Sequence, residues 1–492
     1  MILNFLIIKM LKLITKQLSW GVLGSVFTFL IGFFIKTYVI RQVGTVEWGR
    51  YATAHTFVIF VDGILSLGLP LIILKFMPDL IVKSRSMASQ FIRKILVYAL
   101  FISFLFLVCM YFLSPLFDKY IYVNTHNFSY LLLIVSIHAP ISILMGIIIS
   151  LYRSVLKIKE IIIYGTFISV PLRALLTILV FQYTNNIIYF VIIEIFTQLL
   201  VLTILYYLFN KNELEILFLP KDDNYITEKH VITYGKNVYA NSLISLFSTQ
   251  SLSLILGIML PAKQMGVYSI LLTISGLVMF LNKNLRKIFA PAISKLFANN
   301  KINELSDLYK STTFLINLFT IPLGIITMLF ADEILSLFSL EEGELLRYKY
   351  YLFVLVLARM ISLFIGNSKT LMIMSGLEKQ ELLIQSFRSI AVIILSLLLI
   401  KKYELLAVVI LFISSLLFVG IFQFIYMKKD IKVNPFSTKL LLLILLSVPC
   451  VYFAIIQNFI FQYYHFILIP TAVYFLYISI FYNTIKKLYK GL

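Results

Sequence analysis

Charged side chains stand inside long apolar runs of this sequence, far from water. Four cations and two carboxylates are of this kind: Lys36, Arg173, Arg359 and Arg388, with Asp62 and Glu194. A charge in the middle of an apolar span costs about 2.5–3.5 kcal/mol on membrane-insertion scales, so such residues usually have a function. Lysine and arginine there can bind an anionic ligand, and arginine can do so through two parallel hydrogen bonds. We interpret the four cations as candidates for a substrate cavity.

Ion pairing between helices is the alternative role for these charges. Arg173 can pair with Asp62 or Glu194, or the two carboxylates can instead carry a proton or a sodium ion that couples transport to a gradient. Lys75 and Lys369 also lie in apolar runs, but near an end, where a long side chain reaches the interface. Two carboxylates cannot neutralise all of these cations. We therefore expect a hydrophilic cavity that holds water or an anionic ligand.

Signatures of enzyme chemistry are missing from the sequence. His55 and His138 are candidates for a proton relay, although a lone buried histidine is more often a packed, hydrogen-bonded residue. The pair Gly235-Lys236 lacks the rest of a phosphate-binding loop. The two cysteines lie in separate apolar runs, so we expect neither a disulfide framework nor a cysteine metal site. We expect no catalytic residue, no metal and no cofactor, with at most a proton or sodium gradient as the energy source.

The elements that must position these residues are membrane-spanning helices. Of 492 residues, 61% are hydrophobic and 13% are charged, whereas soluble domains have about 25% charged residues. This composition excludes a soluble enzyme, a disulfide-built secreted module and a disordered protein. Runs of about 20 apolar residues predict an all-α polytopic protein with about 14 (12–14) spans. The fourteen runs are 18–40, 51–76, 91–113, 129–151, 161–182, 187–209, 234–260, 266–281, 312–330, 350–374, 382–400, 405–427, 440–456 and 463–482.

The formal net charge of +20 follows this topology. Lysine and arginine gather in alternate loops, such as 83–94 and 428–439, while the intervening loops hold few. Cytoplasmic loops carry such an excess, so both termini are predicted to be cytoplasmic. The basic charge therefore does not indicate nucleic-acid binding.

The chain also repeats itself in parallel orientation. Gly49-x-Tyr51 recurs as Gly266-x-Tyr268, and Pro78 has a counterpart in Pro291. We expect an N-terminal bundle of six spans (1–209), a cytoplasmic linker (210–236), a C-terminal bundle of six spans (237–427) and two additional spans (428–492).

A basic and apolar stretch follows Pro291. Its apolar positions alternate with Lys295, Lys301 and Lys310. This pattern favours an amphipathic helix on the cytoplasmic membrane surface, and a polar hairpin is the alternative.

The motifs of the first two spans carry a family resemblance. The sequence reads Arg41-Gln-Val-Gly44-x4-Gly49-x-Tyr51, and later Asp62-Gly-x4-Gly68-Leu-Pro-x4-Lys75-Phe-x-Pro78. It resembles the opening of Wzx-type polysaccharide flippases of the multidrug/oligosaccharidyl-lipid/polysaccharide exporter (MOP) superfamily. The likeness continues along the chain through the second copy of the repeat.

The resemblance implies two bundles around a central cavity that opens alternately to each side of a bacterial inner membrane. It implies a substrate of undecaprenyl-diphosphate-linked oligosaccharide, flipped to the outer leaflet for O-antigen or capsule synthesis. The polymerase and chain-length regulator of that pathway would be partners. A multidrug exporter of the same superfamily is one alternative, and a polytopic membrane enzyme such as an O-antigen polymerase is another.

Overall fold

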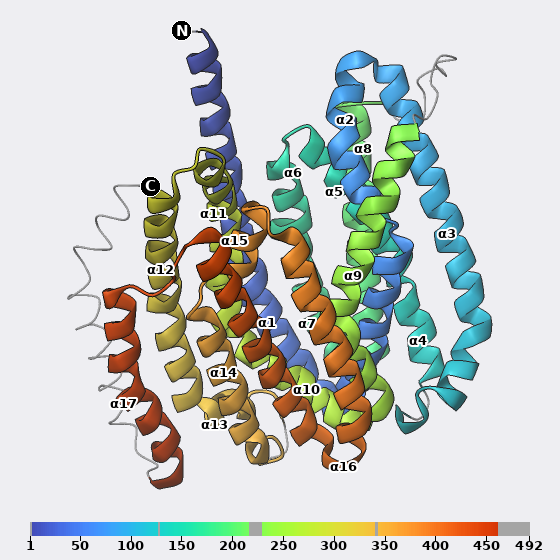
Figure 1. Ribbon diagram of the computed structural model, residues 1–492. Coiled ribbons are helices and arrows are strands. Elements are labelled where there is room, and N and C mark those ends of the chain that lie inside the picture. Colours follow the sequence, from blue (N-terminus) through green and yellow to red (C-terminus); the bar gives the residue numbers. More distant parts are fainter. Residues whose placement is uncertain (1, 126–127, 216–228, 340–342, 461–492) are drawn as a thin grey trace. The chain divides into compact units, whose positions relative to one another are not determined.

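The computed structural model describes residues 2–125, 128–215, 229–339 and 343–460. Every regular element in these ranges is a helix (Figure 1). The chain divides into two compact units, residues 1–267 and 268–492. This boundary falls inside a helix and describes packing, so the division into sequence repeats at 209, 236 and 427 stays a prediction.

Ten helical segments of the described residues are long and apolar enough to cross a membrane. The chain is therefore an all-α, multi-pass membrane protein, as expected from its apolar runs. Two of these segments, Leu23–Leu65 and Glu378–Ile431, are long enough for two spans each, and both contain a break. The run 463–482, which we expect to be the last span, lies outside the described residues.

The first unit is built from the helices α1 to α9 and the start of α10. Their bounds are α1 Ile2–Leu65, α2 Leu69–Lys83, α3 Arg85–Tyr120, α4 Ser129–Ser136, α5 His138–Ser154, α6 Ile158–Ile162, α7 Ser169–Phe181, α8 Ile187–Asn212, α9 Lys229–Met259 and α10 Ala262–Ser275. A short 3-10 helix (Val123–Thr125) lies before α4, and a π-helix (Ile163–Ile168) joins α6 to α7.

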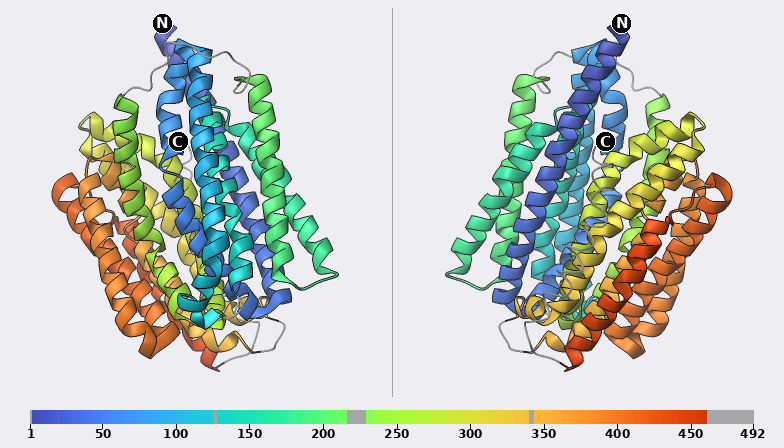
Figure 2. Two further views of the ribbon diagram at one scale, coloured as in Figure 1. Left: turned by 90° about the vertical axis from the view of Figure 1, so that its right-hand side faces the viewer. Right: turned by 90° about the vertical axis from the view of Figure 1, so that its left-hand side faces the viewer.

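The second unit continues from α10 with a 3-10 turn, Gly276–Met279. Its other helices are α11 Phe280–Ala298, α12 Ile302–Leu329, α13 Ala331–Ser336, α14 Lys349–Leu363, α15 Ser368–Met374, α16 Glu378–Tyr426 and α17 Thr438–Ile460, with a 3-10 turn at Leu346–Tyr348 and a π-helix at Met427–Ile431. Figure 2 shows α12 and α17 side by side, and the two helices are in contact.

Breaks in α1 divide its two spans. Gly44 has φ 82° and ψ 169°, a conformation outside the helix that a residue without a Cβ atom adopts freely. The expected second span, 51–76, is not continuous, which corrects the prediction. Leu67 and Gly68 have positive φ between α1 and α2, and Pro70 follows at the start of α2 without a backbone N–H to donate.

The two halves of α16 separate at Glu404, whose φ of 47° and ψ of −126° interrupt the helix. This break lies between the expected spans 382–400 and 405–427. A hydrophobicity pattern finds it because Lys401, Lys402 and Glu404 interrupt the apolar run.

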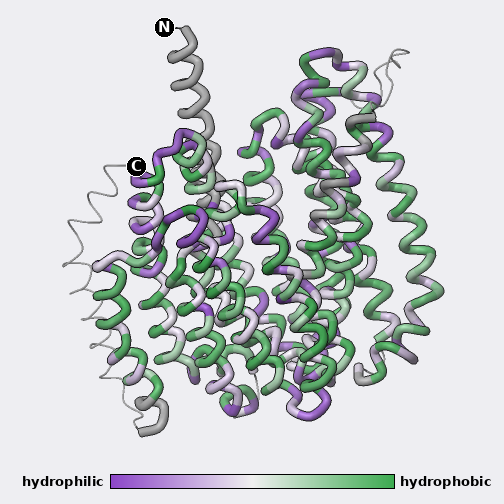
Figure 3. Tube along the Cα trace, in the orientation of Figure 1, coloured by the Kyte–Doolittle hydropathy of each residue, from purple (hydrophilic) through white to green (hydrophobic). Residues whose placement is uncertain are grey.

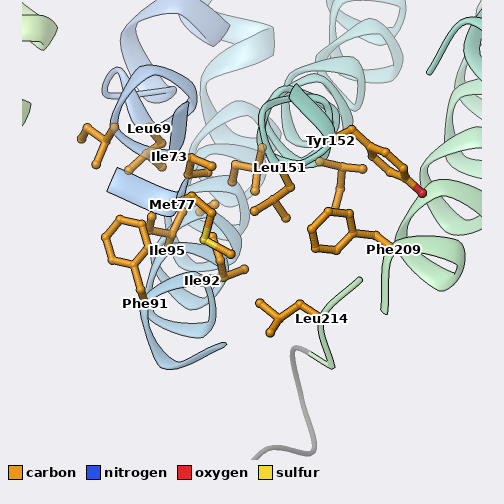
Figure 4. Packing of buried hydrophobic residues seen from close by; sticks show 14 of the residues in the cluster. Leu69, Ile73, Met77, Phe91, Ile92, Ile95, Leu151, Tyr152, Phe209 and Leu214 are labelled. Carbon is orange, nitrogen blue, oxygen red and sulfur yellow. The ribbon is translucent and has the colours of Figure 1, made fainter. Parts of the chain in front are cut away.

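Apolar side chains both fill the interior and cover the outside of the helices. In the first unit, buried residues of α2, α3, α5 and α8 form one cluster, which includes Ile73, Met77, Ile92, Leu151 and Phe209 (Figure 4). Helix α3 also exposes large apolar side chains, and it is green along most of its length in Figure 3. An apolar exterior of this kind is what a lipid-facing helix requires.

A second cluster fills the interior of the second unit and corrects one prediction. Ile293, Leu305 and Tyr309 are buried in it, so the stretch after Pro291 is not an amphipathic helix that lies on the membrane surface. It forms the α11–α12 hairpin, in which the exposed turn at Asn300 has φ 56°. The apolar side chains of α11 and α12 pack within the unit because the turn folds α12 against α11.

The repeated glycines meet each other in the first unit. A Cβ atom on Gly49 of α1 would lie 1.7 Å from the carbonyl oxygen of Ala262, and one on Gly266 of α10 would lie 2.0 Å from that of Thr45. No larger residue fits at either position without moving a backbone. The Gly-x-Tyr motifs therefore mark a close crossing of α1 and α10.

Candidate functional site

A buried carboxylate, Glu194 of α8, is the centre of a polar cluster in the first unit. Its side chain accepts a hydrogen bond of 2.9 Å from the Arg173 guanidinium of α7 at Oε1. Oε2 accepts a second, of 2.7 Å, from the Tyr51 hydroxyl of α1. Glu194 is 8% exposed. Because both oxygens have donors and one donor is charged, the ionised carboxylate is stabilised although it is buried.

Two histidines extend the cluster. His138 Nε2 lies 3.7 Å from Glu194 Oε2, and His138 Nδ1 lies 3.3 Å from the Gln198 side-chain oxygen. His55 stacks on Tyr51 with 5.4 Å between ring centroids and faces His138 edge-on at 6.3 Å. Carboxylate, phenol, imidazole and guanidinium are thus in one connected group, a composition that can hold and pass protons.

Irregular helix segments position this cluster. The helix is interrupted at Ile137, between α4 and α5 and immediately before His138. Pro140 follows in the first turn of α5. Arg173 follows Pro171, and the π-helix Ile163–Ile168 lies just before it. A proline cannot donate to the preceding turn and its ring displaces a carbonyl, so such segments commonly accompany it. They commonly occur at functional sites too.

Lys36 and Asp62, both on α1, differ in their surroundings. Lys36 is exposed on the part of α1 before Gly44, and it interacts electrostatically with His55. Asp62 accepts a 2.9 Å hydrogen bond at Oδ2 from the Ser142 hydroxyl of α5, and its buried Oδ1 has no partner. No cation pairs with Asp62 in the part of the chain that the structure describes.

Arg359 of α14 is a half-buried cation of the second unit. Its guanidinium reaches the Leu272 carbonyl oxygen of α10 at 3.5 Å and lies 5.5 Å from the centroid of the Phe412 ring. Its Nε is buried without a hydrogen-bond partner. Within the described ranges no carboxylate pairs with it. The site is therefore a positive charge in apolar surroundings with unused donors, which favours an incoming anion.

Arg388 of α16 belongs to another group of the second unit. Glu381 attracts both Arg388 and Lys369 electrostatically. Glu381 is 3% exposed and accepts hydrogen bonds from Gln423 at 2.7 Å and Gln385 at 2.8 Å. Arg388 therefore has a protein carboxylate nearby, unlike Arg359.

The structure brings together two of the six candidates, Arg173 and Glu194, and leaves the others in separate places. Sequence reasoning missed the contribution of Tyr51, which was noted only as part of the repeat, and it missed Glu381 at the edge of a span. The Gly-x-Tyr repeat was a signal for Tyr51. No group of histidine, cysteine, aspartate and glutamate in the described residues could hold a metal ion.

Sequence comparison gives one family. The family described as "Polysaccharide biosynthesis protein" matches residues 39–340. No curated protein matches the chain by sequence. The matched stretch includes Arg173 and Glu194 and ends before Arg359.

Solved structures of the MOP superfamily have the same fold. The structure titled "Lipid II flippase MurJ, inward closed conformation" has a TM-score of 0.69 at 18% identity. The match covers 94% of this chain and 98% of the MurJ chain. An inward-facing MATE family multidrug resistance transporter has a TM-score of 0.68 at 14% identity, covering 82% and 94%. A MOP superfamily transporter from Pyrococcus furiosus has a TM-score of 0.60 at 12% identity, covering 86% and 96%.

Proposed function

Because the chain belongs to the polysaccharide biosynthesis protein family, we propose that it is a flippase for lipid-linked oligosaccharides. It moves units carried on undecaprenyl diphosphate from the cytoplasmic to the outer leaflet of the bacterial inner membrane, for O-antigen, capsule or another surface polysaccharide. The family's description and the fold shared with a lipid II flippase support a substrate of this class. The protein is a transporter rather than an enzyme.

The observation that carries this proposal is the half-buried guanidinium of Arg359, whose buried Nε has no hydrogen-bond partner. A charged group with unused donors in apolar surroundings is costly unless a ligand of opposite charge joins it. The diphosphate of the proposed substrate is such a ligand, and arginine binds phosphate oxygens through paired hydrogen bonds. The polyprenyl tail can stay in the lipid because only the polar head needs to cross.

Arg173 has a different role in this mechanism, since Glu194 already neutralises it. A diphosphate can bind Arg173 only if it competes with that carboxylate or if the carboxylate takes up a proton. Protonation of Glu194 would remove its charge and release Arg173 for the substrate. Binding of a proton at Glu194 together with an anion at Arg173 would couple transport to a proton gradient, and a sodium ion at Glu194 would act in the same way. His138 beside the carboxylate offers a path for the proton.

Deletion of the gene tests the function directly. We expect undecaprenyl-diphosphate-linked oligosaccharide to accumulate in the inner leaflet and surface polysaccharide to be lost, as measured by mass spectrometry of extracted lipids. If single unpolymerised units still reach the cell surface, the protein is a polymerase and the proposal is wrong. The polymerase and the chain-length regulator of the same pathway are its expected partners.

Substitution of Arg359 tests the carrying observation. Arg359→Gln should lower export of the lipid-linked oligosaccharide at least tenfold, while Arg359→Lys should keep part of it because the positive charge remains. Normal export by Arg359→Gln at equal protein level would exclude this residue from substrate binding.

A multidrug exporter is the second candidate, and Asp62 is the observation that favours it. This carboxylate has no cationic partner among the described residues, and a cationic drug needs such an anion. If the protein is a multidrug exporter, Asp62→Asn should sensitise cells to cationic dyes while leaving surface polysaccharide intact. If the protein is a flippase, the same substitution should leave dye sensitivity unchanged.

A further inference from the structure

A pocket at one end of the first unit lies apart from the buried charges. Its volume is about 510 Å³, within the range of small-molecule sites. Three segments that are distant in sequence line it: the part of α1 just after Gly44, the start of α4, and the loop between α7 and α8. These segments lie at the same end of the unit in Figures 1 and 2. By the predicted topology this end faces outward.

The polar groups of the pocket balance each other in charge. Arg50 donates a 2.6 Å hydrogen bond from its guanidinium to Glu47, so the pair is neutral as a whole. The Arg50 Nε is buried and has no hydrogen-bond partner. Asn185 and Thr184 add amide and hydroxyl groups, which both donate and accept. The Tyr130 side chain is 64% exposed and adds an aromatic face.

This composition suits a neutral ligand with many hydroxyl groups. The Glu47–Arg50 pair is neutral as a whole, so the pocket favours neither an anion nor a cation, and an apolar ligand would leave its amide and hydroxyl groups without partners. Vicinal hydroxyls of a sugar can join guanidinium, carboxylate and amide groups at once, and the C–H face of a sugar ring can lie on an aromatic side chain.

From this geometry we propose a saccharide subsite in the pocket formed by Glu47, Arg50, Tyr130, Thr184 and Asn185, which binds a sugar of the oligosaccharide head. The inference rests on the proposed function and extends it, because it separates recognition of the sugars from recognition of the diphosphate.

The pocket is linked along the helices to the Glu194 cluster. Arg50 precedes Tyr51, whose hydroxyl binds Glu194. Ile187 lines the pocket and begins α8, and Glu194 follows two turns later, about 10 Å along the helix at 1.5 Å per residue. A sugar in the pocket would therefore lie about two helical turns from Glu194.

Binding of free saccharide to the full-length protein in detergent tests the proposal. The probe is the repeating-unit oligosaccharide released from the surface polysaccharide of the source cells, and inorganic pyrophosphate is the second probe. Trp48 is buried beside Tyr51 at a ring distance of 5.0 Å, so its fluorescence can report binding once Trp20 is replaced by Phe. Calorimetry gives an independent dissociation constant.

We expect Arg50→Met and Tyr130→Ala each to raise the dissociation constant of the oligosaccharide about tenfold, equivalent to about 1.4 kcal/mol. Both side chains reach the pocket surface, so the fold should tolerate these changes. The matched control is Tyr183→Ala, because Tyr183 is 89% exposed in the neighbouring loop and does not line the pocket. It should bind as the unchanged protein does. Pyrophosphate binding should depend on Arg359 and not on Arg50.

Three results would overturn the subsite: no saturable binding of the oligosaccharide, unchanged binding by both pocket variants, or displacement of the sugar from the pocket by pyrophosphate. The deletion experiment separates these failures from that of the flippase proposal. Accumulated lipid-linked oligosaccharide with unchanged binding by the variants rejects the subsite alone. Specific loss of sugar binding without accumulation rejects the flippase and leaves a saccharide site.

Discussion

The two units hold a half-buried arginine in opposite ways. In the first unit Arg173 has its own carboxylate, Glu194, which also accepts a hydrogen bond from Tyr51. In the second unit Arg359 has a backbone carbonyl and the ring of Phe412, and within the described residues no carboxylate. One site is electrically complete without a ligand, and the other is not.

The two sites use related positions of the repeat. Tyr51 and Tyr268 stand at the same place in the two Gly-x-Tyr motifs, and Tyr268 interacts electrostatically with Arg359. His138 and Arg359 each lie in the fourth expected span of a half. Glu194 comes seven residues after the start of α8, and Phe412 comes seven residues after Leu405, which follows the break in α16. In the predicted repeat, the same position therefore holds a carboxylate in one half and an aromatic ring in the other.

This difference teaches that the charge balance of each half can change while the helices stay alike. We infer that the first site responds to protons or other cations, which compete for Glu194, whereas the second responds to anions. Four substitutions can break or sharpen this distinction.

The largest effect is expected from Glu194→Leu. It leaves the half-buried Arg173 without its counter-ion and Tyr51 without its acceptor, and removal of one partner of a buried pair costs about 3–5 kcal/mol. The melting temperature of the purified protein in detergent should fall accordingly. The double variant Arg173→Leu/Glu194→Leu should recover the stability but not export. Recovery of both would mean that the pair is purely structural and that the first site has no role in transport.

The crossing of α1 and α10 is common to both motifs, and Gly49→Ala tests it. A methyl group there would strike the Ala262 carbonyl, so we expect a loss of about 3 kcal/mol, at the upper end of overpacking costs. Gly32→Ala on the same helix is the control, since no atom lies within 4 Å of its Cβ position. Equal melting temperatures for both variants would contradict the close crossing.

Removal of the tyrosine hydroxyls separates the two sites more finely. Tyr51→Phe takes away a hydrogen bond to a buried carboxylate, which is worth about 1.5–3 kcal/mol. Tyr268→Phe should change stability much less, because among the described residues no carboxylate accepts a hydrogen bond from the Tyr268 hydroxyl. A comparison of the two melting temperatures measures the difference, and equal losses would show that the carboxylate is not what distinguishes the sites.

The smallest effect is expected from Phe412→Glu, which would give Arg359 a counter-ion like that of Arg173. We expect export to fall at least tenfold, about 1.4 kcal/mol, because the new carboxylate competes with the substrate anion. Phe412→Leu is the control, which loses only a cation–π contact of about 1 kcal/mol. Undiminished export by Phe412→Glu would show that anions do not bind at Arg359.

Hydropathy alone predicted most of the fold, because helices such as α3 and α8 each contain a long apolar run, 91–113 and 187–209. It failed where the backbone leaves the helix inside an apolar run. Leu67 and Gly68 interrupt the second span without any charged residue beside them that would end it. It failed again after Pro291, since a sequence pattern shows which face of a helix is apolar but not what covers that face.

The site was predictable only in part. Intramembrane charge identified Arg173, Glu194 and Arg359 as unusual residues. Which carboxylate meets Arg173 depends on how α7 packs against α8, and no local pattern contains that information. The Tyr51–Glu194 contact joins residues 143 positions apart. Glu381 escaped notice because a carboxylate at the edge of a span looks solvated until Gln423 is seen to cover it.

The glycine crossing has a consequence for how the halves of this chain can diverge. Each glycine is confined by the backbone beside the other, so a larger residue at Gly49 would not be relieved by any side-chain change at Gly266. Substitutions elsewhere, such as glutamate in one half and phenylalanine in the other, can be absorbed by neighbouring side chains. We expect this pair of motifs to remain recognisable in related sequences after the other traces of duplication have been lost.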